Sequence, residues 1–257
     1  MGKGTGGDSA VRLVQLYPDL LGTYGDGGNA TVLAKRLAWR GIPHELVTVE
    51  SGAPTPEQGD LYLLGGGEDG PQVEAARELA ERGALHRAVE RGAVVFAVCA
   101  GMQILGHQFP DAAGQPRPGL ALLDIQTVRL QRPRAVGELL VQPDPCWGLP
   151  ELTGFENHGG RTRLGPAARP LGRVEVGEGN GWGEEGAVSG RVVGTYLHGP
   201  ALARNPALAD LLLGWVAGEL APLDDREVEM LREQRIRAAR QRELQPRRSW
   251  KDLIRRG

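Results

Sequence analysis

Apolar runs of strand length alternate with amphipathic stretches along the first half of the chain. The apolar runs lie at residues 11–16, 45–49, 60–64 and 94–98. Apolar residues recur at helical spacing over residues 31–40 and 73–91, and from Met102 to Phe109. Strands that alternate with helices form parallel sheets joined by right-handed crossovers. We therefore predict an α/β fold with a mostly parallel sheet flanked by helices.

The pattern in the second half of the chain predicts more strands and a closing helix. The strands are predicted at residues 124–130, 136–141, 171–176 and 191–196, and the helix at residues 206–218. The first two of these strands alternate like an antiparallel pair. Residues 156–162 are polar, and we interpret them as a loop able to line a cleft.

Changes in composition divide the chain into three parts. Residues 1–10 are Gly-rich and polar and are expected to be a disordered lead-in, residues 11–220 form the folded domain, and residues 221–257 form a charged helical extension. The extension is dense in Arg and Glu with sparse apolar residues, which favours a solvated helix and a loose basic end. A docking segment for a partner protein is the alternative.

The overall composition excludes several classes of protein. The 257 residues carry a formal net charge of −2, which gives no case for a nucleic-acid surface. The two cysteines can build neither a disulfide framework nor a thiolate zinc site, so we expect no metal and a reducing, cytoplasmic location. No apolar run is long enough to span a bilayer, so no direct membrane insertion is expected. No GxxxxGK[ST] sequence for nucleotide phosphates occurs, so we expect no cofactor.

Cys99 occupies a turn between a predicted strand and a predicted helix. The apolar run ends at this cysteine, and the small pair Ala100-Gly101 opens the helical segment. Such a turn places the sulfur at the carboxyl end of a parallel strand, beside backbone N–H groups that favour a thiolate. The same geometry forms the nucleophile elbow of hydrolases. On the turn alone, a catalytic thiol and a buried structural cysteine are equally well supported.

Two histidines are candidates for the base that a thiol nucleophile needs. His198 follows a predicted strand and precedes Gly199-Pro200, whereas His158 lies in the polar segment beside Glu156. Either imidazole could accept the thiol proton and return it to a leaving group. The pattern alone does not choose between them.

A run of three glycines, Gly65 to Gly67, follows the strand predicted at residues 60–64. Glycines at the end of a strand let backbone N–H groups approach a ligand closely, so they could donate hydrogen bonds to an oxyanion. A flexible turn is the alternative, and the glycines taken alone favour it.

Three motifs surround the candidate residues: LLGGGEDGPQ, FAVCAGMQILG and GTYLHGP. Together they resemble class I glutamine amidotransferases of the cobyric acid synthase type. Four further stretches are YPDLLGTYGDGGN, RAVGELL, ENHGGRT and YLHGPALARNPALAD. They resemble in particular the glutaminase subunit of lipid II isoglutaminyl synthase. The resemblance covers residues 11–213. It implies the flavodoxin-like class I glutamine amidotransferase fold, with Cys99 in a nucleophile elbow.

The resemblance also implies roles for particular residues. Cys99 would be the nucleophile, and His198 would be its general base and acid. The backbone N–H groups of Gly66 or Gly67 and of Ala100 would donate hydrogen bonds to the oxyanion. Arg134 would bind the α-carboxylate of L-glutamine.

The chain departs from many class I amidotransferases in one respect. Those enzymes carry a glutamate two residues after the catalytic histidine, whereas Pro200 stands at that position here. A Cys–His dyad is therefore the simplest prediction. Glu156 is a candidate for orienting His198 from another loop.

The implied reaction is hydrolysis of L-glutamine to glutamate and ammonia. Residues 1–10 leave no room for the ATP-dependent domain that precedes the glutaminase in cobyric acid synthases, so a separate synthetase is expected. The implied partner is a Mur ligase-like (MurT-type) subunit that amidates the D-glutamate α-carboxylate of lipid II, in a heterodimer. The alternatives are a glutaminase for another acceptor such as a corrinoid, a non-catalytic scaffold that regulates a ligase, and a cysteine peptidase.

Overall fold

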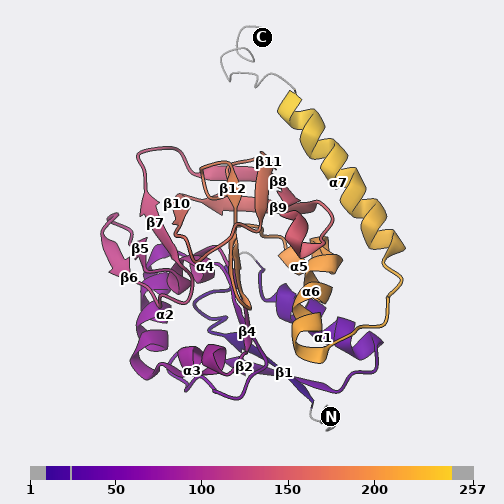
Figure 1. Ribbon diagram of the computed structural model, residues 1–257. Coiled ribbons are helices and arrows are strands. Elements are labelled where there is room, and N and C mark those ends of the chain that lie inside the picture. Colours follow the sequence, from indigo (N-terminus) through magenta and orange to yellow (C-terminus); the bar gives the residue numbers. More distant parts are fainter. Residues whose placement is uncertain (1–9, 24, 245–257) are drawn as a thin grey trace, which may run out of the picture.

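The computed structural model describes residues 10–23 and 25–244 (Figure 1). The predictions of a disordered lead-in at residues 1–9 and of a loose basic end at residues 245–257 concern segments outside the described residues. Within that part of the chain, no helix combines the length and the apolar character that a bilayer crossing requires.

A six-stranded sheet forms the centre of the molecule. In spatial order its strands are β13 (Ala187–Ser189), β14 (Val192–Thr195), β4 (Val94–Val98), β3 (Leu61–Leu64), β1 (Val11–Leu16) and β2 (His44–Val49). All neighbours are parallel except the edge pair β13 and β14. The predicted mostly parallel sheet is confirmed, and parallel order brings the carboxyl ends of β3, β4 and β14 to one edge.

Helices cover both faces of this sheet. They are α1 (Gly28–Trp39), α2 (Asp69–Arg82), α3 (Ala84–Glu90), α4 (Ala100–Leu105), α5 (Ala201–Arg204) and α6 (Pro206–Ala217). Figure 1 shows α2, α3 and α4 on one side and α1, α5 and α6 on the other. The helical stretch predicted at residues 73–91 is present but divided into two helices, because Gly83 at φ 57° ends α2 and starts α3. Glycine adopts this left-handed conformation without steric cost.

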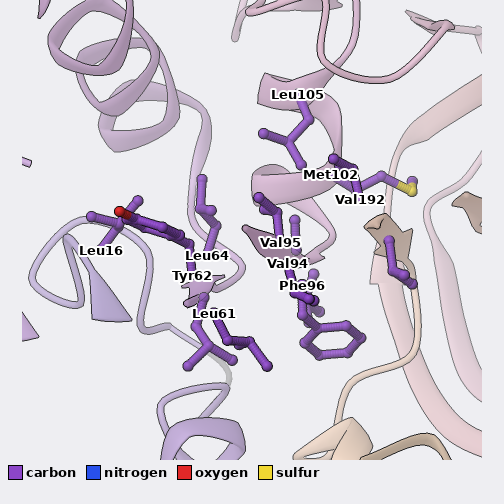
Figure 2. Packing of buried hydrophobic residues seen from close by; sticks show 14 of the residues in the cluster. Leu16, Leu61, Tyr62, Leu64, Val94, Val95, Phe96, Met102, Leu105 and Val192 are labelled. Atoms are coloured by element: carbon purple, nitrogen blue, oxygen red, sulfur yellow. The ribbon is translucent and has the colours of Figure 1, made fainter. Parts of the chain in front are cut away.

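The buried core joins the central strands to the helix after Cys99. All five residues of β4 are buried, as expected for a strand covered on both faces. Met102 and Leu105 of α4 pack in the same cluster as Leu64 and Phe96 (Figure 2). The turn at Cys99 is therefore held between a rigid strand and a buried helix.

Two four-stranded sheets lie beyond the central one, and their pairing corrects a prediction. One contains β10 (Gly160–Leu164), β7 (Ile125–Arg129), β5 (Gln108–Pro110) and β6 (Pro116–Pro118); the other contains β12 (Glu184–Glu185), β11 (Gly172–Val176), β8 (Ala135–Pro143) and β9 (Leu152–His158). The predicted pairing of residues 124–130 with 136–141 is wrong, because β7 pairs with β10 whereas β8 pairs with β9 and β11. Alternation identifies the buried face of a strand but not its partner.

The prediction of a loop at residues 156–162 is also wrong, although Asn157 to Gly160 do line a pocket, as expected. These residues form the end of β9 and the start of β10. They remain in strands because their polar side chains find buried partners, including the hydrogen bond between the hydroxyls of Thr127 and Thr162 at 2.8 Å.

The C-terminal helix α7 (Arg226–Leu244) lies across the sheet of β8, β9 and β11 (Figure 1). Ile236 and Ala239 pack in a small cluster with Leu140 and Val176. Arg240 forms ion pairs with Glu175 of β11 and with Glu151, the residue before β9. A short 3-10 helix (Pro145–Trp147) lies between β8 and β9.

Candidate active site

Cys99 lies in a sharp turn between β4 and α4. Its backbone has φ 51° and ψ −106°, and its N–H donates to the carbonyl of Thr195 at 2.8 Å. A non-glycine residue in this region costs free energy and persists only where surrounding structure holds it, typically at functional sites. The predicted strand, turn and helix around Cys99 are therefore present.

The glycine after the turn permits this geometry. Gly101 donates its N–H to the carbonyl of Gly65 at 3.1 Å, so the elbow is tied to the end of β3. A Cβ atom on Gly101 would lie 2.8 Å from the Cβ of Leu64, closer than atoms pack. The small residue is required for close packing of α4 against β3.

His198 is fixed beside Cys99 from the end of β14. Its backbone pairs with Phe155 of β9 through hydrogen bonds of 2.8 and 3.1 Å in the two directions. The Nδ1 atom lies 3.0 Å from Oδ2 of Asp26, and only 1% of the imidazole is exposed. The imidazole also interacts with the Cys99 side chain.

The electrostatics of His198 favour its protonated form. Burial lowers the pKa of this imidazole, but hydrogen bonds with Asp26 and Cys99, together with their negative charges, raise the pKa to about 10. A histidine with this environment holds a proton that it can deliver to a leaving group. Cys99, His198 and Asp26 therefore have the arrangement of nucleophile, acid–base and orienting carboxylate.

Asp26 corrects the prediction of a dyad. It belongs to the loop between β1 and α1, and its side chain is fully buried. The alternative carboxylate, Glu156, instead bonds Nε2 of His158 at 3.0 Å and accepts the N–H groups of Glu178 and Gly179. Because Asp26 precedes His198 by 172 residues, no local pattern could connect them. The signal was the acidic residue within the motif YGDGGN.

His158, the other candidate base, has a different environment. Its ring stacks on Tyr196 with the centroids 3.8 Å apart, and Nδ1 lies 3.1 Å from the carbonyl oxygen of Gly160. Glu156 occupies the other ring nitrogen. Although His158 lines the same pocket as Cys99, both its nitrogens are engaged within the protein. The geometry favours His198 as the base.

The glycine run after β3 separates into two roles. The N–H of Gly66 donates to Oδ2 of Asp26 at 2.9 Å, so in this structure it supports the carboxylate that orients His198. Gly67 and Ala100 line the pocket with Cys99. Gly67 and Ala100 thus line the pocket, whereas the N–H of Gly66 is engaged with Asp26, and the oxyanion roles stay predictions.

Arg134 reaches the same pocket from the loop before β8. Its Nε and Nη2 atoms donate to the side-chain and main-chain oxygens of Asn157, each at 3.1 Å. Both acceptors are uncharged, so they do not neutralise the positive charge of the guanidinium. A guanidinium on the pocket wall suits a ligand carboxylate.

A buried acid that the sequence analysis did not single out supports the segment leading to His198. Oε1 of Glu185 accepts from the hydroxyl of Thr195 at 2.7 Å and from the N–H of Tyr196 at 2.6 Å, whereas Oε2 has no hydrogen-bond partner among the residues that the structure describes. Burial raises the pKa of Glu185 to about 7, although the hydrogen bonds from Thr195 and Tyr196 oppose the shift.

No group of three or more His, Cys, Asp or Glu side chains is arranged to hold a metal ion within residues 10–23 and 25–244. The residues around Cys99 instead form a thiol site with a base, an orienting carboxylate and backbone donors. This constellation can attack an amide or ester carbon and form a thioester.

Comparison with known families decides the class. A model of the CobB/CobQ-like glutamine amidotransferase domain matches residues 12–206. The chain belongs to this family. The predicted resemblance and the predicted enzyme class are thereby confirmed.

Curated relatives extend over most of the chain. Subunit GatD of lipid II isoglutaminyl synthase (glutamine-hydrolyzing) from Streptococcus pneumoniae is 33% identical over 204 residues, which is 77% of each chain. GatD from Staphylococcus aureus is 35% identical over 207 residues, 79% of this chain and 83% of that one. Cobyric acid synthase from Pelotomaculum thermopropionicum is 40% identical over 152 residues, but these are 52% of this chain and 27% of that protein.

A solved structure supports the fold. A crystal structure of a glutamine amidotransferase matches with a TM-score of 0.57 at 21% identity, covering 81% of this chain and all of that one (100%). This chain therefore has the α/β fold of a glutamine amidotransferase.

Proposed function

We propose that the chain is the glutaminase subunit of a GatD-type lipid II isoglutaminyl synthase. The observation that carries the proposal is the buried contact of His198 with Asp26 and Cys99 at the end of β14 and β4. The similarity to two GatD subunits over more than three quarters of the chain supports this choice of enzyme.

In this mechanism the Cys99 thiolate attacks the side-chain amide carbon of L-glutamine. Backbone N–H groups of Gly67 and Ala100 donate to the resulting oxyanion, and each such donor contributes about 3 kcal/mol. His198 then gives its proton to the departing nitrogen, which leaves as ammonia. A γ-glutamyl thioester remains on Cys99.

The second half of the reaction restores the enzyme. Neutral His198 takes a proton from water, and the hydroxide attacks the thioester carbon. The carbon–sulfur bond breaks, glutamate is released and Cys99 regains its thiolate while His198 keeps the proton. Arg134 holds the α-carboxylate of the substrate through both steps.

We propose a separate ATP-dependent, Mur ligase-like (MurT-type) subunit as the consumer of the ammonia. It would activate the α-carboxylate of D-glutamate in the lipid II stem peptide, and ammonia would convert this residue to isoglutamine. The proposed complex is a heterodimer in the cytoplasm. The two free cysteines, Cys99 and the exposed Cys146, suit a reducing compartment.

The test is release of glutamate from L-glutamine by the purified chain, alone and with a co-expressed Mur-type ligase. Cys99→Ala should abolish release, whereas Cys146→Ala should leave it unchanged because this second thiol is exposed and outside the pocket. Equal release by the wild type and Cys99→Ala would reject the mechanism. Amidation of a corrinoid, but not of lipid II, with the respective synthetases would reject the proposed acceptor.

A further inference from the structure

A cavity of about 500 Å³ adjoins the catalytic pocket. It lies between the start of β8, the end of β11 and the last turns of α7, with Arg132, Val176 and Arg242 on its lining. Its volume is in the range of small-molecule sites. Arg134 lines both this cavity and the pocket of Cys99, so the two spaces share a wall. In the following we call it the Arg242 cavity.

The charges around the Arg242 cavity are unequal once internal pairs are counted. Three lining carboxylates are engaged within the protein: Glu138 pairs with Arg204, Glu156 bonds His158, and Glu178 pairs with Arg161. Among residues 10–23 and 25–244, no carboxylate pairs with Arg132, Arg134 or Arg242. Glu243 also lines the space and has no ion pair with a described residue. Among the described residues, the lining thus holds three guanidinium groups without an ion pair. Two carboxylates oppose them: Glu243, and Glu156, whose hydrogen bonds come from His158 and two backbone N–H groups.

A buried guanidinium, whose charge is paired with Glu178, also lines the cavity. Only 3% of Arg161 is exposed, although it lines the cavity, and its Nε has no hydrogen-bond partner among the described residues. The side chain is packed against Gly181, where a Cβ atom would lie 2.0 Å from Cδ of Arg161. A buried donor of this kind is costly unless a ligand or water approaches it.

We propose that the Arg242 cavity is a second binding site for L-glutamate, which receives this product as it leaves the catalytic pocket past Arg134. The inference rests on the proposed glutaminase function for the source of the ligand. L-Glutamate carries two carboxylates and one ammonium, which complement the unpaired guanidinium groups and the carboxylate of Glu243. Forked hydrogen bonds from arginine suit carboxylates.

The test separates the cavity from the catalytic pocket by chemistry that needs no turnover. In a Cys146→Ala background, iodoacetamide alkylates the remaining thiol at Cys99 and fills the catalytic pocket. Calorimetric titration of this alkylated protein with L-glutamate should still show one site. Arg132→Gln and Arg242→Gln should each weaken binding roughly fivefold, because each removes one exposed charge contact.

Arg237→Gln is the matched control, because Arg237 lies on α7 outside the cavity and pairs with Glu233. It should leave L-glutamate binding unchanged. L-Glutamine should bind at least about fivefold more weakly than L-glutamate, because one of its carboxylates is replaced by an amide.

Three results would overturn the proposal: loss of all binding on alkylation, equal binding by Arg242→Gln, or inorganic phosphate that binds as tightly as L-glutamate. Failure of the glutaminase assay with intact binding to the alkylated protein would reject the proposed function but leave this site in place.

Discussion

Replacement of Asp26 by asparagine isolates the charge that orients and stabilises His198. Oδ2 of Asp26 accepts both the N–H of Gly66 at 2.9 Å and Nδ1 of His198 at 3.0 Å. The amide oxygen of asparagine can accept the same two hydrogen bonds, so Asp26→Asn preserves the shape of the loop. It removes the negative charge beside the imidazolium.

The size of the effect follows from the pKa of His198, which rises from 6.5 to about 10. That rise corresponds to about 5 kcal/mol in favour of the imidazolium. Asp26 and Cys99 both bond the ring and together offset the effect of burial, so we assign to Asp26 a share on the order of 2–3 kcal/mol. The expected loss in kcat for Asp26→Asn is therefore about 70-fold.

Steady-state glutamate release measures this change. Asp19→Asn is the matched control, because Asp19 lies on the same loop but is exposed and bonds Ser51. It should retain wild-type activity. If Asp26→Asn keeps kcat within about threefold of the wild type, with an unchanged circular dichroism spectrum, Asp26 does not support the base and the reasoning is wrong.

Three further predictions concern other parts of the site. The folded-state pKa of Glu185 is raised from 4.5 to about 7, so its contribution to stability is fully present below pH 4.5 and is lost as the pH rises through 7. Between pH 4.5 and 8, the free energy of unfolding measured with urea should therefore fall by about 3 kcal/mol in the wild type, and Glu185→Gln should remove this fall. An unchanged pH dependence in the variant would show that Glu185 does not titrate in this range. Gly101→Ala should lower the free energy of unfolding by about 1–3 kcal/mol because the new Cβ meets Leu64. Gly70→Ala is the control and should not destabilise the protein, because no neighbouring atom lies within 4 Å of a Cβ at that position. Equal melting temperatures of the two variants would contradict the packing argument. Arg134→Gln should raise the KM for L-glutamine about tenfold with little change in kcat, and an unchanged KM would remove Arg134 from the substrate site.

The central sheet and the elbow were predictable because their signals are local. The apolar run ending at Cys99 and the small residues after it determine strand, turn and helix within one stretch of the chain. His198 and Arg134 were found through motif resemblance, and the structure places both on the pocket or beside its thiol. Their catalytic and binding roles stay predictions until the assays above.

The errors arose where distant segments meet. The partner of β7 is β10 rather than β8, because the tertiary arrangement and not the alternation selects it. Asp26 was overlooked because its loop contains several turn-forming residues, and nothing in that loop indicates a histidine 172 residues away. Polar residues of β9 and β10 were predicted as a loop because sequence alone does not show which polar groups will be paired in the interior.

The two hydrogen bonds to Oδ2 of Asp26 have a consequence for how substitutions combine. One oxygen joins the backbone of Gly66 to the ring of His198, so the glycine run and the base cannot shift independently. A change that displaces the loop at Gly67 would also rotate the imidazole. Double-mutant cycles between this loop and Asp26 should therefore show strong non-additivity, and the oxyanion donors and the proton carrier would behave as a single thermodynamic unit.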